Sequence, residues 1–368
     1  MLSVAKGFCH SIFVYDVALA IDLDEAERSI TAVTQRETIR HKRKAPRYFE
    51  YRPAPLRISQ EAAPVRIAAT LEAHARVELV VYDFGAVSVI YQIPLGGGLA
   101  DLLALSELLY ENDQLLADSQ RRVEELVGMV RRSLSASRIS SFVEDYVIFQ
   151  VEAFSGPVAV RELTGEHAQQ LAQVLRAEAR ALSEDEVIDA LSHRISYGDS
   201  DLVIVDWNAA LVIDAEADDV LTVLEFANVE LLEMRFLDQR LDDALAQAYE
   251  RLTRRSGSWL LLRSAPSDLR EISQWQVDSA ILFEGVNNVL KLLGDQYLAR
   301  LYRLTAERFH LSDWDASILR KLDTLERIYQ KISDQVVSRR MEGLEWIIIV
   351  LIAVSIAIYF VPGLPLQR

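Results

Sequence analysis

Four carboxylates in the stretch DAEADDVLTVLE have a spacing that could bind calcium. Asp214, Glu216, Asp218 and Glu225 occupy positions one, three, five and twelve of a calcium-binding loop. Position six of such a loop needs a glycine for its sharp turn, but Asp219 stands there, and the preceding segment has the pattern of a strand. We therefore expect an acidic helix start, which the positive end of the helix dipole favours, and no calcium site.

Two glycine-containing stretches resemble nucleotide-handling motifs. Asp83-Phe84-Gly85 spells the magnesium-binding triplet of protein kinases, yet no glycine loop, strand lysine or His-Arg-Asp sequence accompanies it at useful spacing. We interpret the triplet as a tight hairpin turn. Gly96 to Gly98 could offer amide donors to a phosphate, but the Walker lysine and hydroxyl residue are absent, and Asp101 would repel an anion. A flexible strand-to-helix connection is the preferred interpretation.

The remaining polar residues name no catalytic set. No His-Glu-x-x-His or similar metal spacing occurs among the histidines, which are His10, His41, His74, His167, His193 and His310. Serine, histidine and aspartate residues are common in this chain, and a catalytic triad is recognised by the positions of its side chains, so the sequence alone identifies none. The single cysteine, Cys9, cannot form an internal disulfide, which fits a reducing compartment. We predict no catalytic residue, no cofactor and no metal ion, and thus a protein that is not an enzyme.

One basic cluster interrupts an otherwise acidic chain. The net charge of -16 and the pI near 4.9 argue against a general attraction to phosphate backbones or anionic lipids. Lys42, Arg43, Lys44 and Arg47 nevertheless lie together in the stretch IRHKRKAPRY. This cluster is either a solvated loop between a helix and a strand or a contact for RNA phosphates or anionic lipid heads.

The elements that must position these residues alternate between strand and helix. Apolar, β-branched patterns predict strands at 12–23, 47–59 and 141–154, a hairpin at 77–93 that turns at 83–85, and a strand pair at 201–214 that turns at 206–208. Helical patterns cover 24–39, 99–134, 164–196 and the region from 218. This order predicts an α+β head over residues 1–265, with helices on one face of a sheet and a possible division near residue 160.

Residues 266–343 have the pattern of two long helices. The apolar residues that recur at three- and four-residue spacing are Trp275, Leu282, Val286, Val289 and Leu293, then Ile318, Leu322, Leu325, Tyr329, Ile332 and Val336. The stretch FHLSDWD supplies a stop and a restart, with Ser312 as the N-cap and Asp315 at capping-box spacing. We predict an antiparallel helical hairpin, or stalk, whose apolar stripe could also meet a second copy.

The tail stretch LEWIIIVLIAVSIAIYF has no polar face. Between Ile347 and Phe360 only Ser355 and Tyr359 carry polar groups. Residues 344–361 give about 26 Å of helix at 1.5 Å per residue, near the lower limit for a bilayer core. We predict one transmembrane helix there and a short tail over 362–368, against the alternative of a helix buried in a core or an oligomer. The proposed anchor residues are Trp346, Ile347, Ile348, Ile349, Val350, Leu351, Ile352, Tyr359 and Phe360.

Three stretches resemble one known family. They are VVYDFGAVSVIYQ, the long helical stretch that begins YLARLYRLTAERF, and RMEGLEWIIIVLIAVSIAI. Together they are similar to the family named for "required for meiotic nuclear division", a domain of unknown function, although the middle of the chain departs from its pattern. The resemblance implies a membrane-anchored, oligomeric protein. Eukaryotic members are associated with organisation of the mitochondrial inner membrane and with translation by the mitochondrial ribosome.

These observations leave two classes of function. The first is a non-enzymatic, tail-anchored scaffold that self-associates and presents its head to a protein or ribosome partner. The second is a membrane-anchored enzyme or ligand-binding protein with a pocket in the head. We prefer the first, with the bulk of the chain facing the cytoplasm and a bacterial inner membrane as the location. No small-molecule substrate can be named from the sequence.

Overall fold

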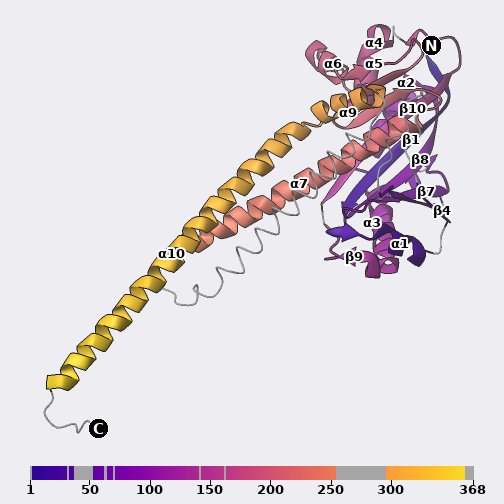
Figure 1. Ribbon diagram of the computed structural model, residues 1–368. Helices are drawn as coiled ribbons and strands as arrows, with labels where there is room; N and C mark the ends of the chain where they lie inside the picture. The colour runs from indigo at the N-terminus through magenta and orange to yellow at the C-terminus, as the bar shows by residue number, and fades with distance from the viewer. Residues whose placement is uncertain are drawn as a thin grey trace. The chain divides into compact units, whose positions relative to one another are not determined.

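The structure is a computed structural model that forms two compact units (Figure 1). The described residues are 2–30, 33–36, 53–61, 64–68, 71–140, 142–160, 163–253 and 296–360. Unit 1 consists of Met1–Leu237 and Ala280–Asp315, and unit 2 of Asp238–Ser279 and Ala316–Arg368. The fold and the candidate site described below belong to unit 1.

A large mixed sheet forms the centre of unit 1 (Figure 1). Its nine strands follow the order β11-β12-β13-β10-β1-β8-β7-β4-β3. Their bounds are β1 Ser3–Asp16, β3 Val33–Arg36, β4 Leu56–Glu61, β7 Arg76–Val81, β8 Ala86–Gly98, β10 Val143–Phe154, β11 Arg194–Ile195, β12 Leu202–Val205 and β13 Ala209–Ile213. Strands β10 and β13 pair in parallel, and the other pairs of this sheet are antiparallel. Two small sheets join β2 (Ala20–Ile21) with β9 (Leu134–Ser135), and β5 (Arg66–Ala68) with β6 (Leu71–Glu72).

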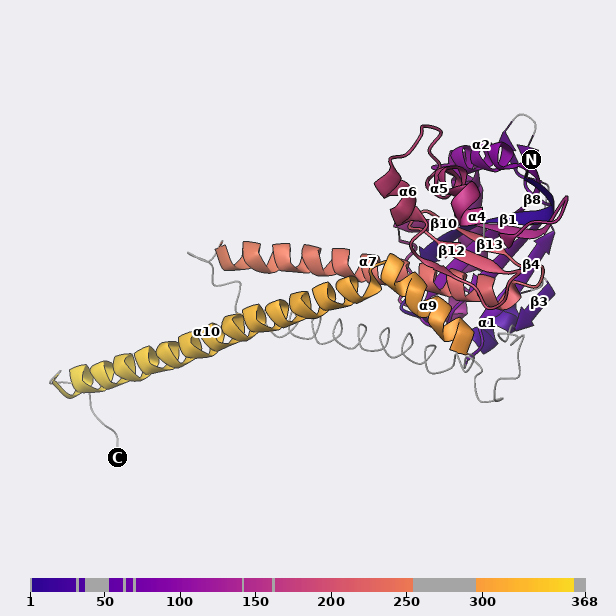
Figure 2. The ribbon, with the colours of Figure 1, turned by 90° about the horizontal axis from the view of Figure 1, so that it is seen from above.

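One face of the sheet is covered by helices from the middle of the chain (Figure 2). These are α2 (Leu99–Leu109), α3 (Asp113–Met129) and α5 (Ala168–Arg176), of which α2 and α5 are labelled in Figure 2. Successive side chains of a strand point to opposite faces, so Cys9, Phe13 and Tyr15 of β1 all point to this side. They belong to the main core cluster, and the Tyr15 hydroxyl bonds the Ser119 hydroxyl of α3.

The opposite face is covered by the first half of α7 (Asp218–Thr253). The alternate β1 side chains Phe8, His10 and Ile12 line a cavity together with residues of α7. Helix α9 (Gln296–Arg308) packs beside α7, where the Tyr302 hydroxyl donates a hydrogen bond to Glu230. The α+β class is confirmed, but the prediction of helices on one face is wrong. Both faces of the central strand are buried, so both need a covering layer.

Several element boundaries differ from the predictions because of local backbone signals. The predicted helix over 99–134 is two helices, since Glu111 has a positive φ of 53° and the Asn112 side chain caps α3 by accepting from Leu115 N at 3.0 Å. The predicted helix over 24–39 ends early, as α1 (Leu23–Ser29), and the chain then forms β3. A single 3-10 turn (Arg131–Ser133) follows α3.

Other predicted elements are confirmed. The hairpin at 77–93, the strand at 141–154 and the strand pair that turns at 206–208 are present as β7–β8, β10 and β12–β13. The helical region at 164–196 contains α4 (Leu163–Glu166), α5 and α6 (Glu184–Ala190). Residues 47–52, at the start of the predicted extended segment, lie outside the described residues, and β4 begins at Leu56.

Unit 2 joins the second half of α7 to α10 (Leu311–Phe360). Lys321 of α10 forms ion pairs with Asp238 at 2.8 Å and Asp242 at 2.6 Å, and Ser317 donates to Asp238 at 3.1 Å. The first helix of the predicted stalk, with Trp275 to Leu293, lies outside the described residues.

The predicted break near FHLSDWD is confirmed, because α9 ends at Arg308 and α10 begins at Leu311. Ser312 is not the N-cap, since it lies inside α10. Asp313 N already donates to the carbonyl oxygen of His310 at 2.9 Å, and His310 itself has a positive φ of 54°.

In the apolar part of α10, the structure describes the side chains of residues 344–356, and all of them are exposed. In the part of the chain that the structure describes, no helix is long and apolar enough to cross a membrane.

Candidate functional site

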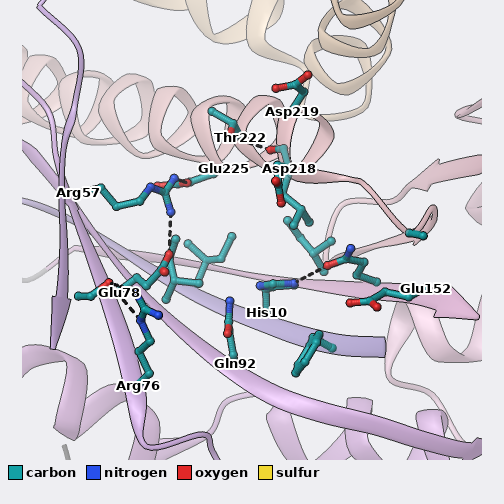
Figure 3. Close-up of a pocket in the computed structure, with 18 residues that line it drawn as sticks. His10, Arg57, Arg76, Glu78, Gln92, Glu152, Asp218, Asp219, Thr222 and Glu225 are labelled. Carbon is teal, nitrogen blue, oxygen red and sulfur yellow. Dashed lines mark hydrogen bonds and ion pairs between the residues drawn. The ribbon is translucent and has the colours of Figure 1, made fainter. Parts of the chain in front are cut away.

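A cavity of about 580 Å³ lies between the sheet and the first turns of α7 (Figure 3). Its floor consists of side chains from β4, β7, β8, β1 and β10, and its roof consists of Asp218, Asp219, Leu221, Thr222 and Glu225 of α7. This volume lies in the range of pockets that hold small molecules. We regard the cavity as the candidate site.

Strand register places three polar side chains in one row across the floor. His10 of β1 stands opposite Gln92 of β8. Arg76 lies on β7, the strand on the other side of β8, and also lines the cavity. Directly opposed residues point to the same face, and neighbouring strands lie about 5 Å apart. The row therefore presents a guanidinium, an amide and an imidazole over about 10 Å.

A chain of hydrogen bonds fixes the protonation of the His10 ring. The Gln150 amide nitrogen donates to the carbonyl oxygen of Asp214 at 3.3 Å, so the Gln150 amide oxygen faces His10 Nε2, 3.0 Å away. An amide oxygen only accepts, so Nε2 carries the hydrogen. Burial lowers the pKa of His10 below its usual value, against the opposing effects of Gln150, Glu78 and Asp218. The ring is then neutral, and Nδ1 is an acceptor that bonds no described residue.

Arg57 connects the floor to the roof. Its Nη1 lies 2.9 Å from Glu78 and its Nη2 lies 3.0 Å from Glu225 of α7. The Tyr82 hydroxyl donates to the second Glu225 oxygen at 2.9 Å. Both oxygens of Glu225 are thereby occupied, and the second turn of α7 is held against β4 and the end of β7. The Arg57 charge is committed to these two carboxylates.

The acidic stretch that resembled a calcium loop starts α7. Asp214 accepts from Glu216 N at 3.0 Å, and α7 begins at Asp218 with Asp218 and Asp219 in its first turn. The predicted acidic helix start is confirmed. Glu225, at the last loop position, bonds Arg57 and Tyr82 instead. Among the described residues, no group of three or more histidine, cysteine, aspartate or glutamate side chains could hold a metal ion.

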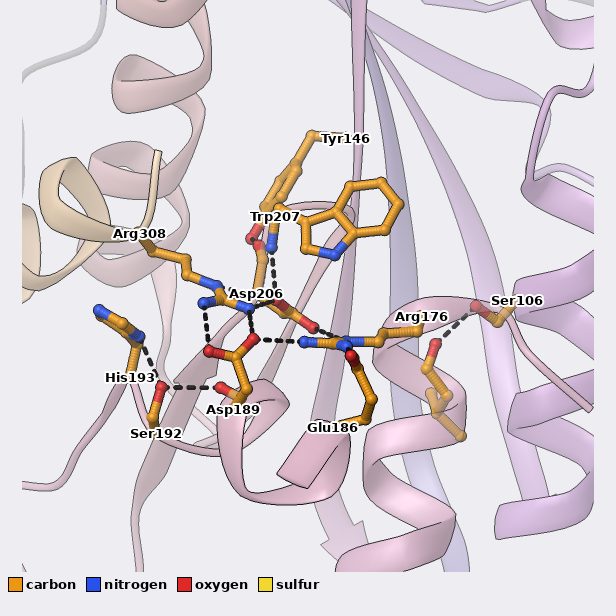
Figure 4. A network of polar contacts seen from close by, with 11 residues as sticks. Ser106, Tyr146, Arg176, Glu186, Asp189, Ser192, His193, Asp206, Trp207 and Arg308 are labelled. Atoms are coloured by element: carbon orange, nitrogen blue, oxygen red, sulfur yellow. Dashed lines mark hydrogen bonds and ion pairs between the residues drawn. The ribbon is translucent and has the colours of Figure 1, made fainter. Parts of the chain in front are cut away.

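A second polar cluster surrounds Asp206 at the β12–β13 turn (Figure 4). Asp206 is fully buried, and Arg176 Nε and Arg308 Nε lie 3.0 Å and 2.8 Å from its two oxygens. Both arginines also bond Asp189 of α6, and Arg308 lowers the pKa of this carboxyl to about 2. The two arginines and the two aspartates neutralise one another, and their contacts join α5, α6 and the end of α9 to the β12–β13 turn. We assign this cluster a structural role.

Gly85 and the stretch Gly96 to Gly98 have structural roles that follow from their backbone conformation and their neighbours. Gly85 has a φ of +106°, and a Cβ atom there would lie 1.7 Å from the carbonyl oxygen of Ala18, so the hairpin-turn interpretation is confirmed. Gly96 to Gly98 lie at the predicted transition from strand to helix, as the last residues of β8, and Gly98 is the N-cap of α2. The Asp101 carboxylate accepts from Gly98 N at 2.7 Å and so occupies the helix start.

The remaining candidates from the sequence lie away from the cavity. The basic cluster, Lys42, Arg43, Lys44 and Arg47, is outside the described residues, as are the side chains of Tyr359 and Phe360. Trp346 to Ile352 are exposed on α10. Sequence reasoning did not single out Arg57, Arg76, Gln92 or Gln150 and mentioned His10 only among the histidines. The cavity residues come from distant strands, so no local spacing marks them.

Comparison with known proteins places the chain in a family. Residues 6–219 match the family model described as "Uncharacterized protein MJ0711, N-terminal domain". The chain belongs to this family. A relative, the uncharacterized protein MJ0711 of Methanocaldococcus jannaschii, is 26% identical over 208 residues, which are 56% of this chain and 62% of the relative. The chain thus covers less than two thirds of that relative. No solved structure matches this chain.

This match does not agree with the family that the sequence stretches suggested. It supports the MJ0711 N-terminal domain family and gives no support to the resemblance to the meiotic nuclear division family. The matched region contains the whole strand floor of the cavity and ends at residue 219, in the first turn of α7. The candidate site therefore lies largely inside the MJ0711 N-terminal domain.

Proposed function

We propose that the protein is a membrane tether, in which the apolar end of α10 inserts into a lipid bilayer and the α+β head binds a protein or ribonucleoprotein partner. The observation that carries this proposal is the exposure of every described side chain from Leu344 to Ile356. Ile349, for example, is 53% exposed, and Trp346 is 67% exposed.

Such exposure is unfavourable in water. Successive residues of a helix point in directions about 100° apart, so an apolar run covers its whole circumference. A helix that is hydrophobic all round needs a nonpolar environment on all sides. No described part of the chain covers this stretch, which argues against a core helix of the same chain. The remaining environments are a bilayer and an oligomer core, and we prefer the bilayer because Trp346 stands at one end of the apolar segment like an interfacial aromatic anchor.

Orientation and partner belong to the same proposal. Arg339 and Arg340 precede the apolar segment, so the positive-inside rule puts the head on the cytoplasmic side, which we propose to be that of a bacterial inner membrane. The stalk helices would bring copies together as a homo-oligomer. A protein or ribosome partner for the head is part of this proposal.

The anchor is tested by placing charges in the apolar stretch. In carbonate-washed membranes, the wild type should remain in the pellet. The double variant Ile349→Asp/Ile352→Asp should move to the supernatant, since a charge near the bilayer centre costs about 2.5–3.5 kcal/mol. The matched control, Leu319→Asp/Met341→Asp, adds the same charges to exposed apolar positions of α10 outside the stretch and should stay in the pellet. Release of the wild type by carbonate would contradict the tether.

Measuring the molecular mass of the protein with and without detergent distinguishes a helix in a bilayer from a helix buried in an oligomer. If the helix is buried in an oligomer, the wild type should be soluble as an oligomer without detergent, and Ile349→Asp/Ile352→Asp should dissociate it. If it is in a bilayer, the wild type needs detergent to remain in solution. A soluble oligomer without detergent would contradict the membrane tether and would show that the helix is buried in an oligomer.

A second candidate function is favoured by the cavity. A ligand-binding head requires an enclosed polar site, and the space beneath α7 offers unsatisfied acceptors in such a site. This candidate does not depend on the membrane tether.

A further inference from the structure

We propose that the cavity beneath α7 binds a small organic cation, an ammonium or a guanidinium, through acceptors of His10, Gln92 and Asp218. The proposal rests on the ligand-binding candidate and specifies its ligand class. It is independent of the membrane tether. Figure 3 shows the three side chains around the cavity, two on the floor and one on the roof.

Three acceptors that bond no described residue line the cavity. His10 is only 7% exposed, and its Nδ1 is the unprotonated nitrogen of the ring. The Gln92 side chain and the Asp218 carboxylate form no hydrogen bond or ion pair with the described part of the chain. His10 is buried, Gln92 is half-buried and Asp218 is exposed, so the cost of a missing partner falls on the His10 ring, and a ligand that supplies a donor would remove it. An ammonium carries three N–H donors, which equals the number of acceptors.

The charges around the cavity favour a cation. Its lining includes five carboxylates, namely Glu78, Glu152, Asp218, Asp219 and Glu225, and two guanidiniums, Arg57 and Arg76. Lys6 pairs with Glu152 from outside the lining. The carboxylates of the lining outnumber its guanidiniums. Because charges interact more strongly in a partly enclosed site than in bulk water, this excess attracts cations and repels anions.

The positions of the arginines fix where the cation lies. Arg57 is committed to Glu78 and Glu225, and Arg76 donates to the Ser59 hydroxyl at 2.7 Å and 3.2 Å. Arg76 stands at one end of the floor row and His10 at the other, about 10 Å away across the strands. The cationic group therefore belongs at the His10 end, beneath Asp218.

Alternative ligand classes fit less well. A divalent metal would need several protein ligands, and no such group exists among the described residues. A phosphate would meet the excess negative charge, and the Asp218 and Asp219 carboxylates already occupy the first turn of α7, where a helix start could otherwise bind an anion.

Calorimetric titration of the full-length protein in detergent tests the ligand class. Putrescine and agmatine serve as cationic probes, 1,4-butanediol as the neutral analogue of putrescine, and inorganic phosphate as the anion. We expect one cation to bind per chain, with at least about tenfold lower affinity for butanediol, the effect of one charge-assisted hydrogen bond. Binding of neither cation, or tighter binding of butanediol or phosphate, would overturn the proposal.

Variants locate the binding site. Asp218→Asn should weaken putrescine binding about tenfold or more, because it removes the charge from the roof. Asp243→Asn makes the same change on an exposed turn of α7 outside the cavity and should bind as the wild type does. Equal weakening in both variants would show that the cation responds only to net charge and would overturn the site. Carbonate-resistant membrane association should be the same in both variants.

A second readout needs no variant. In long-range ¹H–¹⁵N spectra of histidine-labelled protein, His10 should show the tautomer with hydrogen on Nε2, and its Nδ1 resonance should shift when putrescine is added. A ring with hydrogen on Nδ1, or a Nδ1 resonance that putrescine leaves unchanged, would contradict the proposed contact.

Discussion

Gly85 closes the β7–β8 hairpin where the chain touches the segment after β1. Val17 N donates to the Gly85 carbonyl oxygen at 3.0 Å, and the Ala18 carbonyl oxygen occupies the place where a side chain would begin. Its φ of +106° is a conformation that other residues rarely adopt. The glycine of the Asp-Phe-Gly triplet is therefore a packing requirement, and the triplet needs no metal-binding explanation.

Replacing Gly85 should destabilise the head. Gly85→Ala combines backbone strain with a collision against Ala18, so the free energy of unfolding should fall by about 3 kcal/mol. Gly128→Ala is the control, because Gly128 lies in helix α3 with open space around it, and it should stabilise by about 0.5–1 kcal/mol. Urea unfolding measures both. A loss below about 1 kcal/mol for Gly85→Ala would contradict the turn geometry.

Glu230 is a buried carboxyl whose ionisation costs stability. Burial, with a smaller contribution from Asp315, raises its pKa to about 7, although the Tyr302 hydrogen bond opposes this shift. Below pH 4.5 the carboxyl is protonated in both the folded and the unfolded protein. Between pH 4.5 and 7 the unfolded chain releases the proton first, so stability decreases as the pH rises.

The variant Glu230→Gln should remove that loss. Glutamine cannot ionise and can still accept from Tyr302, so the variant should match the wild type at pH 4.5 and exceed it by about 3 kcal/mol at pH 8. Denaturant midpoints at both pH values measure the difference. Glu307→Gln, at an exposed position of α9, should show no such change with pH. A constant difference across the range would disprove the raised pKa.

Among the elements, α9 depends on a buried charge cluster at its last residue. Arg308 bonds the fully buried Asp206 and the exposed Asp189, and Phe309 packs edge-on against Tyr146 with ring centroids 5.2 Å apart. Removing one partner of a buried pair leaves the other charge uncompensated. The end of α9 is thus set by polar contacts as well as by apolar packing.

Arg308→Ala should cost about 3 kcal/mol of unfolding free energy, because Asp206 would keep Arg176 as its one cationic partner among the described residues. Arg303→Ala, on the same helix, removes only a hydrogen bond to the Ala299 carbonyl oxygen and should change stability by less than about 0.5 kcal/mol. Chemical unfolding compares them. Equal effects would show that helix propensity, and not the cluster, determines the loss.

The elements also show which parts of the fold the sequence could predict. The β7–β8 hairpin and the β12–β13 pair were predictable because alternating apolar residues and turn residues are local signals. The break between α2 and α3 was missed, since the positive φ of Glu111 and the cap of Asn112 interrupt an apolar pattern that otherwise continues.

The candidate site was predictable only in fragments. Asp218 and Glu225 were noticed for their spacing, but Arg57 and Tyr82, the partners of Glu225, lie more than a hundred residues earlier in the chain. His10 and Gln150 are separated by 140 positions and meet because β1 and β10 pair. Such contacts follow from strand order, which a single sequence does not specify.

At the scale of the whole molecule, α7 contributes to both units, and we expect these units to open at different free energies. Its first half belongs to unit 1, and its second half bonds α10 in unit 2. Unit 1 has an extensive apolar core, whereas the described contacts that connect α7 to α10 include the ion pairs of Lys321. Regions with fewer buried contacts open at lower free energy.

Lys321→Ala should therefore loosen unit 2 alone. Loss of its pairs with Asp238 and Asp242 should weaken local protection by about 1 kcal/mol, which raises amide exchange in residues 239–250 several-fold. Residues 218–232 should exchange as before. Arg327→Ala, whose described partner Asp323 lies on the same helix, is the control. Faster exchange throughout the head would contradict separate stabilities.

The floor and the roof of the cavity come from different parts of the chain. The floor belongs to the sheet that defines the MJ0711 N-terminal domain, whereas Leu221, Thr222 and Glu225 of the roof follow the last matched residue. The family match thus covers the floor, together with Asp218 and Asp219, and most of the roof lies beyond it. Two descendants could keep the His10 row and recognise different molecules by exchanging a few residues in the second turn of one helix.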